Sequence, residues 1–133
     1  MTTPTDDRRR VDSGTKWEAV AGYCRAIRVG DRILVSGTVA VDPEGNLVGL
    51  DNAATQTRYI IDKIERAIIE LGGTLADVVR TRMFVADIYN WERVAKAHGD
   101  RFGPIRPVTT LVQAQLIGPE FLVEIEAEAV VSG

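Results

Sequence analysis

Apolar residues recur every three or four positions in two stretches of the chain, which predicts two amphipathic helices. The first spans residues 51–72, from two N-capping side chains to a pair of glycines. The second spans residues 90–103 and ends at a Gly-Pro pair. Its buried stripe is predicted to contain Trp91, Val94, His98 and Phe102.

β-branched and alternating apolar runs predict five strands, at residues 22–29, 32–36, 78–88, 108–116 and 121–131. Gly30-Asp31 is a tight-turn signal, so the first two runs are expected to form a hairpin. The element order β-β-α-β-α-β-β predicts an α+β sandwich, a mixed β-sheet with the two helices on one face.

The other face of this sheet carries an unusual mixture of side chains. Alternation places Glu124, Glu126 and Glu128 away from the helices. In the predicted strand 78–88 the same rule puts Arg80, Arg82 and Phe84 on this outer face and Val79, Met83 and Val85 under the helices. In the predicted strand 108–116 the outer-face residues are Thr109, Leu111, Gln113 and Gln115. Two interpretations remain open: a solvated face with cross-strand ion pairs, or a face that packs against other copies of the chain.

Length and composition limit the classes of protein to which the chain can belong. The 133 residues fit one domain, and residues 1–16 are polar enough to predict a flexible N-terminal arm before a single domain at 17–133. A net charge of −3 disfavours nucleic acid as a partner, and no apolar run is long enough for a membrane span. One cysteine excludes an intrachain disulfide, and the first residues lack the apolar core of a secretory signal, so a cytoplasmic location is expected.

Few residues suggest metal or cofactor chemistry. His98 is the only histidine and lies on an apolar stripe, which is more typical of a core or interface histidine than of a general base. One histidine and one cysteine cannot build a metal site, and glycine-rich phosphate loops are absent from the sequence. We therefore expect no metal and no organic cofactor.

Three segments resemble the Rid family, also called YjgF or reactive intermediate imine deaminases and formerly L-PSP endoribonucleases. They read GYCRAIRVGDRILVSG (22–37), DVVRTRMFVADIYNWERV (77–94) and LVEIEAEAV (122–130), and the resemblance runs from about residue 17 to residue 131. It implies a chorismate-mutase-like fold and a homotrimer, with a central barrel and small-molecule clefts between subunits. It also implies hydrolysis of enamines and imines to carbonyl products and ammonia without a cofactor.

The resemblance assigns roles to individual residues. Glu124 matches the catalytic glutamate and Tyr23 the tyrosine of the cleft, whereas Thr109 stands where the family has its substrate-binding arginine. The chain thus resembles a branch that lacks this arginine, and Arg106 and Arg25 are the other candidates for binding a substrate anion. From the residues alone, Glu124 could equally pair with an arginine of the outer face, and Tyr23 and Thr109 could simply pack in strands.

Three functions follow as hypotheses. The first is an imine deaminase in which Glu124 positions water. The second is a trimer that binds or senses a small metabolite without turnover, which the missing arginine motivates. The third, an endoribonuclease, rests only on the older family name, and the acidic net charge weighs against it.

Overall fold

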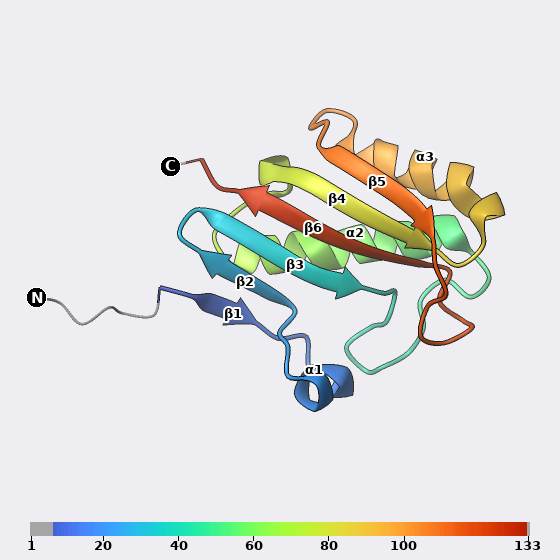
Figure 1. The fold of residues 1–133 in the computed structure, drawn as a ribbon, viewed down its shortest axis with the longest axis horizontal. Helices are drawn as coiled ribbons and strands as arrows, with labels where there is room; N and C mark the ends of the chain where they lie inside the picture. The colour runs from blue at the N-terminus through green and yellow to red at the C-terminus, as the bar shows by residue number, and fades with distance from the viewer. Residues whose placement is uncertain (1–6, 133) are drawn as a thin grey trace, which may run out of the picture.

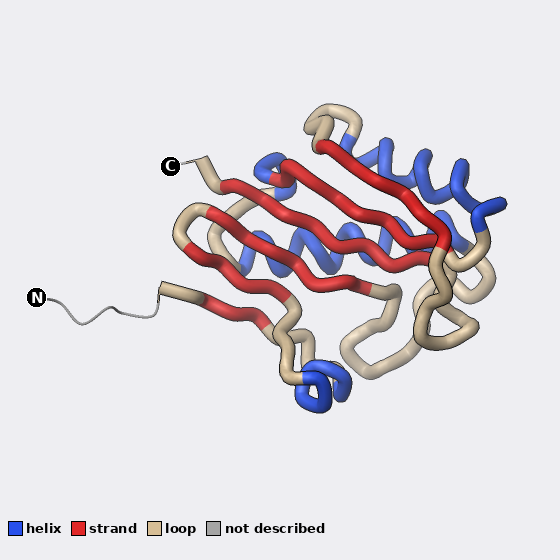
Figure 2. The backbone as a smooth tube through the Cα atoms, viewed as in Figure 1, coloured by secondary structure: helices blue, strands red, loops and turns tan. Residues whose placement is uncertain are grey.

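The structure, a computed structural model, describes residues 7–132. One sheet with the strand order β1-β2-β3-β6-β4-β5 carries α2 and α3 on the same face (Figure 1, Figure 2). β4 and β5 run parallel and the other neighbours antiparallel, so the predicted mixed sheet is confirmed. The strands are β1 Arg9–Val11, β2 Ala26–Val29, β3 Arg32–Thr38, β4 Val78–Val85, β5 Val108–Gln113 and β6 Val123–Val130; the helices are α1 Lys16–Ala21, α2 Ala53–Glu70 and α3 Trp91–Phe102.

The long helix α2 forms for local reasons that the sequence already carries. The Asn52 side chain accepts a hydrogen bond from the Thr55 amide at 3.0 Å, and Gly72 follows the helix with φ +88°. Its apolar stripe is fully buried against β3 and β6, with Ile60, Ile61, Ile64 and Ile68 at its centre. Each such side chain contributes about 1.5–3 kcal/mol by leaving water. In α3 the stripe starts one turn later than predicted, because Trp91 is 49% exposed.

The predicted N-terminal arm is wrong for part of its length. Arg9–Val11 forms β1, which pairs with β2 so that Arg9 lies opposite Arg28 and Val11 opposite Ala26. Both arginines donate to the carbonyl of Leu71 at the end of α2. Backbone pairing and these hydrogen bonds hold a polar segment that has little apolar surface to bury, which composition alone does not reveal. Residues 1–6 of the predicted arm lie outside the described residues.

The register of the sheet corrects two predicted faces. β4 and β5 pair with Thr81 opposite Thr109, Met83 opposite Leu111 and Val85 opposite Gln113. The predicted outer-face positions Thr109, Leu111 and Gln113 therefore lie on the helix side, and Gln115 lies beyond the end of β5. A register shift between Val78 and Arg80 inserts Val79 as an extra residue, which is why Val79 is exposed instead of buried. Among the described residues, no helix has the length and apolar character needed to cross a bilayer.

Candidate functional site

Glu124 differs from the other two outward glutamates of β6. Glu126 accepts from Arg82 at 2.9 Å, and Glu128 pairs with two arginines at 3.3 and 3.9 Å. The residue opposite Glu124 across the β4–β6 pairing is Phe84, which offers no charge. Within residues 7–132 the Glu124 carboxylate has neither an ion pair nor a side-chain hydrogen bond. The predicted alternative, pairing of Glu124 with Arg80 or Arg82, is therefore not formed.

The carboxylate of Glu124 lies directly on the backbone of Gly37 at the end of β3. A β-carbon added to Gly37 would overlap Oε2 of Glu124 and come within 3.0 Å of its carboxyl carbon. Burial raises the pKa of Glu124, and although the charge of Arg25 opposes this, the neighbouring Glu126 reinforces it. A carboxyl group with a raised pKa and no fixed partner is suited to exchanging protons with a bound molecule.

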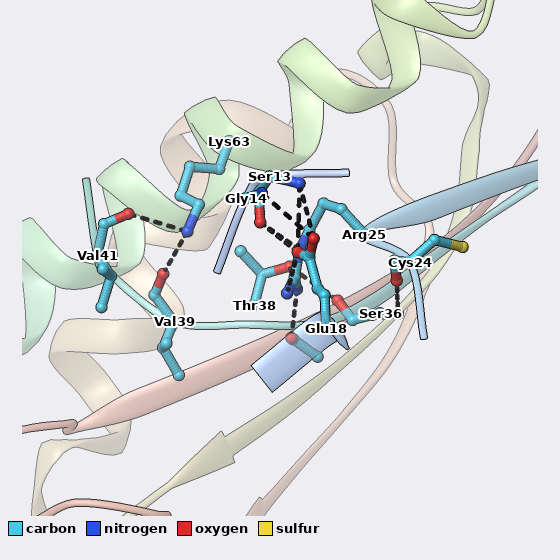
Figure 3. A network of polar contacts seen from close by, with 11 residues as sticks. Ser13, Gly14, Glu18, Cys24, Arg25, Ser36, Thr38, Val39, Val41 and Lys63 are labelled. Carbon is cyan, nitrogen blue, oxygen red and sulfur yellow. Dashed lines mark hydrogen bonds and ion pairs between the residues drawn. The ribbon is translucent and has the colours of Figure 1, made fainter. Parts of the chain in front are cut away.

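Arg25 is buried beside this glutamate, but most of its hydrogen-bonding capacity is already used. Its guanidinium forms an ion pair with Glu18 at 3.2 Å and donates to the Gly37 carbonyl at 2.6 Å and to Thr38 Oγ1 at 3.0 Å (Figure 3). Burial acts to raise the pKa of Glu18, but hydrogen bonds from Ser13 and the charge of Arg25 outweigh it and hold this pKa below its usual value. Arg25 thus fastens α1 to the end of β3 and supports the backbone on which Glu124 lies.

Tyr23 belongs to the same group of residues. It lies between α1 and β2, so the prediction that it belongs to a strand at residues 22–29 is wrong. Its ring lies 5.7 Å from the Arg25 guanidinium carbon, and 39% of the residue is exposed. Contacts therefore run continuously from Tyr23 through Arg25 and Gly37 to Glu124, which places both predicted catalytic residues around one end of β3.

Arg106 and Thr109 lie at the β5 edge of the sheet, separated from Tyr23, Arg25 and Gly37 by the strands β6 and β4. β5 is an edge strand, and its Val112 lies level with Glu124 across β4. Thr109 is three residues before Val112 and Arg106 six, which is roughly 10 Å and 20 Å along the strand. Arg106 is exposed, with φ +57° before Pro107. Within one chain, therefore, neither Arg106 nor Thr109 reaches Glu124, and of the three candidate anion-binding residues only Arg25 lies near it.

A chain of polar contacts leads from the core to this edge. His98 is buried on α3, and its Nε2 lies 2.9 Å from Thr81 Oγ1, which in turn lies 2.7 Å from Thr109 Oγ1. Burial lowers the pKa of His98, so the ring favours its neutral form. The prediction of a satisfied core histidine is confirmed. Among the described residues no three histidine, cysteine or acidic side chains gather as a metal site requires.

A family model described as Endoribonuclease L-PSP matches residues 14–131. The chain belongs to this family, which includes the Rid or YjgF proteins. A crystal structure of Rv2704 from Mycobacterium tuberculosis, a member of the YjgF/YER057c/UK114 family, is 45% identical with a TM-score of 0.85, covering 94% of this chain and all of that one.

Two further relatives agree with this assignment. The uncharacterized protein SCO2049 of Streptomyces coelicolor is 38% identical over 122 residues, which are 91% of this chain and 90% of that protein. A RutC family protein of Pyrococcus abyssi, PYRAB12510, is 28% identical over 110 residues, 83% of this chain and 87% of that protein. The Rid resemblance and its chorismate-mutase-like fold are thereby confirmed.

Sequence reasoning missed three features of the site in this Rid/YjgF protein. Gly37 was visible only as the last residue of a matched segment, and nothing in the pattern indicated that a carboxylate lies on it. Glu18 was assigned no role, although a buried arginine requires a nearby anion. Thr81 is the third, and the sequence did carry a signal for it. A hydroxyl on the helix side of an alternating strand needs a polar partner, so Thr81 could have been predicted to form a hydrogen bond in the core.

The buried histidine predicts a pH dependence of stability in this Rid/YjgF protein. Because burial lowers the pKa of His98 in the folded chain, the unfolded chain binds that proton more readily. The stability that neutral His98 contributes is therefore complete above its unfolded pKa of about 6.5 and is lost as the pH falls below it. We expect urea unfolding to show a smaller loss of stability between pH 7.5 and 5.5 in His98→Gln than in the wild type.

The quantity to measure is the difference in free energy of unfolding between the wild type and His98→Gln at each pH. Glu124 acts in the opposite direction, because its raised pKa lets the folded chain bind a proton first. Comparing wild type and His98→Gln at each pH removes this shared contribution. Parallel stability curves for the two proteins would contradict the prediction.

Proposed function

We propose that this protein hydrolyses small imines and enamines to a carbonyl product and ammonia, without a metal or organic cofactor. The observation that supports this best is the Glu124 carboxylate, which lies on Gly37 with a raised pKa and, within residues 7–132, without an arginine partner. A glutamate kept only for the solubility of a sheet face would gain from an ion pair such as those of Glu126 and Glu128. Glu124 is instead free to bind and move a proton.

The chemistry requires one proton acceptor that later donates. Glu124 takes a proton from a water molecule while the water oxygen forms a bond to the imine carbon, and it then gives that proton to the nitrogen, which yields a carbinolamine. Glu124 next takes the hydroxyl proton of the carbinolamine and passes it to the amino group, which leaves as ammonia as the C–N bond breaks and the carbonyl forms. Neither step changes an oxidation state. Tyr23 lies in the same group of contacts and would donate a hydrogen bond to the substrate.

A complete cleft would need more than one copy of the chain. Thr109 and Arg106 cannot reach Glu124 within one subunit, since they occupy the β5 edge about 10–20 Å away along the strands. This edge exposes Val108 and Val112, and the outer face exposes Leu34 beside the charged pairs. A homotrimer would cover these apolar side chains and would bring the β5 edge of one copy toward Glu124 of another.

A second candidate function is binding of a small metabolite without turnover. Thr109 supports it, because the hydroxyl that stands in place of the family's arginine is hydrogen-bonded to Thr81 and cannot clamp a carboxylate as a guanidinium does. A cleft with a threonine there suits a neutral or amide-bearing ligand. Ribonuclease activity gains no such support, since the single histidine is buried on Thr81, away from any phosphodiester at the surface.

The test is the rate at which purified protein converts a freshly generated 2-imino acid into the 2-keto acid. An amino-acid oxidase supplies the imine, and parallel reactions contain no added protein or an equal mass of serum albumin. Faster release of keto acid and ammonia supports the deaminase. A rate equal to both controls, together with a rise in melting temperature when a small acid or amide is added, supports the binding protein instead.

A further inference from the structure

A hollow lies between α2 and the segment that contains β1. Its cavity of about 620 Å³ is bordered by residues 11–13, Thr15, Arg25, residues 41–43 and side chains of α2, Lys63 among them. Arg25 therefore borders this cavity as well as supporting Gly37, whereas Tyr23, Gly37 and Glu124 are not among the lining residues. The described lining also contains both acidic and basic side chains, so the cavity has no single sign of charge.

Lys63 is held in a defined position at this cavity. Its Nζ donates to the carbonyl of Val39 at 3.0 Å and to that of Val41 at 2.9 Å (Figure 3). Within residues 7–132 these two carbonyls are its hydrogen-bond acceptors. A neutral amine has two N–H bonds and one lone pair, so the two carbonyls can engage both N–H bonds and leave the lone pair free to react.

The surroundings raise the share of Lys63 that is a neutral amine. Burial is the main cause that lowers the pKa of Lys63 to about 8, and the charges of Arg25 and Arg66 act in the same direction. Glu18 and Asp42 oppose them, and Asp12 and Glu70 also line the cavity. At pH 7.5 roughly a quarter of the chains then carry an uncharged Lys63, against about one in a thousand for an ordinary lysine.

We propose that Lys63 is a covalent binding site for small carbonyl compounds, such as aldehydes and 2-oxo acids, that enter this cavity. The amine lone pair attacks the carbonyl carbon, and a proton passes from nitrogen to oxygen to give a carbinolamine. That hydroxyl takes a proton from solvent water and leaves as water, which gives a protonated imine in which nitrogen retains one N–H bond for the Val39 or Val41 carbonyl. No oxidant or reductant takes part. The Arg66 guanidinium, 5.9 Å from the Tyr59 ring centroid, lines the same cavity and offers a cation to a carboxylate-bearing carbonyl compound.

The experiment compares the three lysines of the intact chain, Lys16, Lys63 and Lys96. The wild-type protein is incubated at pH 7.5 with glyoxylate and cyanoborohydride, which reduces an imine to a stable secondary amine, and each lysine peptide is quantified by mass spectrometry. Lys16 and Lys96 are exposed and serve as internal references. We expect Lys63 to be labelled about tenfold faster or more, and this advantage to shrink at pH 10, where ordinary lysines also lose their protons.

Three variants separate this site from the rest of the molecule. Lys63→Arg should abolish the fast label, and Lys96→Arg should leave it unchanged. Glu124→Gln should also leave it unchanged, because Glu124 does not line this cavity, so failure of the proposed deaminase would not affect this result. Labelling of Lys63 no faster than of Lys16 and Lys96 at pH 7.5 would overturn the proposal, and this comparison within one wild-type chain depends on no variant.

Discussion

Replacing Glu124 by glutamine is expected to reduce the acceleration of imine hydrolysis by about a hundredfold or more. The amide has nearly the same shape as the carboxylate but cannot accept a proton from water. Removing the charge breaks no ion pair among the described residues, so the fold should be kept. The measurement is the rate of keto-acid release by wild type and variant at equal concentration, with the melting temperature of both recorded beside it.

Glu126→Gln is the matched control for this prediction. It makes the same chemical change on the same strand and face, but at a carboxylate that is paired with Arg82 at 2.9 Å. We expect it to keep nearly all of the activity. Equal losses in the two variants would show that the net charge of the outer face matters, and not the proton chemistry of Glu124.

The substitution Gly37→Ala tests the position of the Glu124 carboxylate without changing Glu124 itself. Its new methyl group would occupy the place of Glu124 Oε2 and force the side chain to move, so a comparable loss of activity is expected. Unchanged activity in Gly37→Ala would show that the position of Glu124 on this glycine is unimportant for turnover.

Replacing Arg25 by methionine is expected to lower the free energy of unfolding by roughly 3–5 kcal/mol. The substitution keeps much of the apolar stem but leaves the Glu18 carboxylate buried without its counter-charge, since both residues are only 6% exposed. It also removes the hydrogen bonds to Gly37 and Thr38. Urea unfolding followed by circular dichroism measures the loss, provided that the slope with denaturant is the same in both proteins.

Arg82→Met is the control for the charge itself. Its ion pair with Glu126 has similar geometry but is largely exposed, and such pairs contribute about 0–1 kcal/mol. The double variant Glu18→Gln, Arg25→Met should recover part of the stability, because no isolated charge is then left in the interior. If Arg25→Met destabilises the chain no more than Arg82→Met does, the buried pair does not hold the N-terminal segment in the way we infer.

Features that depend on neighbours along the chain could be predicted from the sequence. The span of α2, with its Asn52 cap, and the buried positions Val94, His98 and Phe102 of α3 follow from a local period of 3.6 residues. The alternation of β6 placed Glu124 on the outer face, and the matched segments indicated the Rid family and its fold. That Tyr23 and Glu124 act in one site stays a prediction of the resemblance.

Which of these residues have partners depends on how the strands pair in the folded sheet. The pairing of β4 with β6 gives Glu126 and Glu128 their arginines and gives Glu124 a phenylalanine. A register shifted by two residues would place Arg82 opposite Glu124, whereas a shift of one residue would turn the side chains of one strand to the other face. The β4–β5 register turned Thr109 toward Thr81, against the prediction, and β1 formed from residues that bury little surface. Strand register pairs positions that are far apart in the chain. The contact between Glu18 and Arg25 joins two residues on either side of a turn. Their energies come from contacts that form only when the whole sheet assembles, so no local pattern records them.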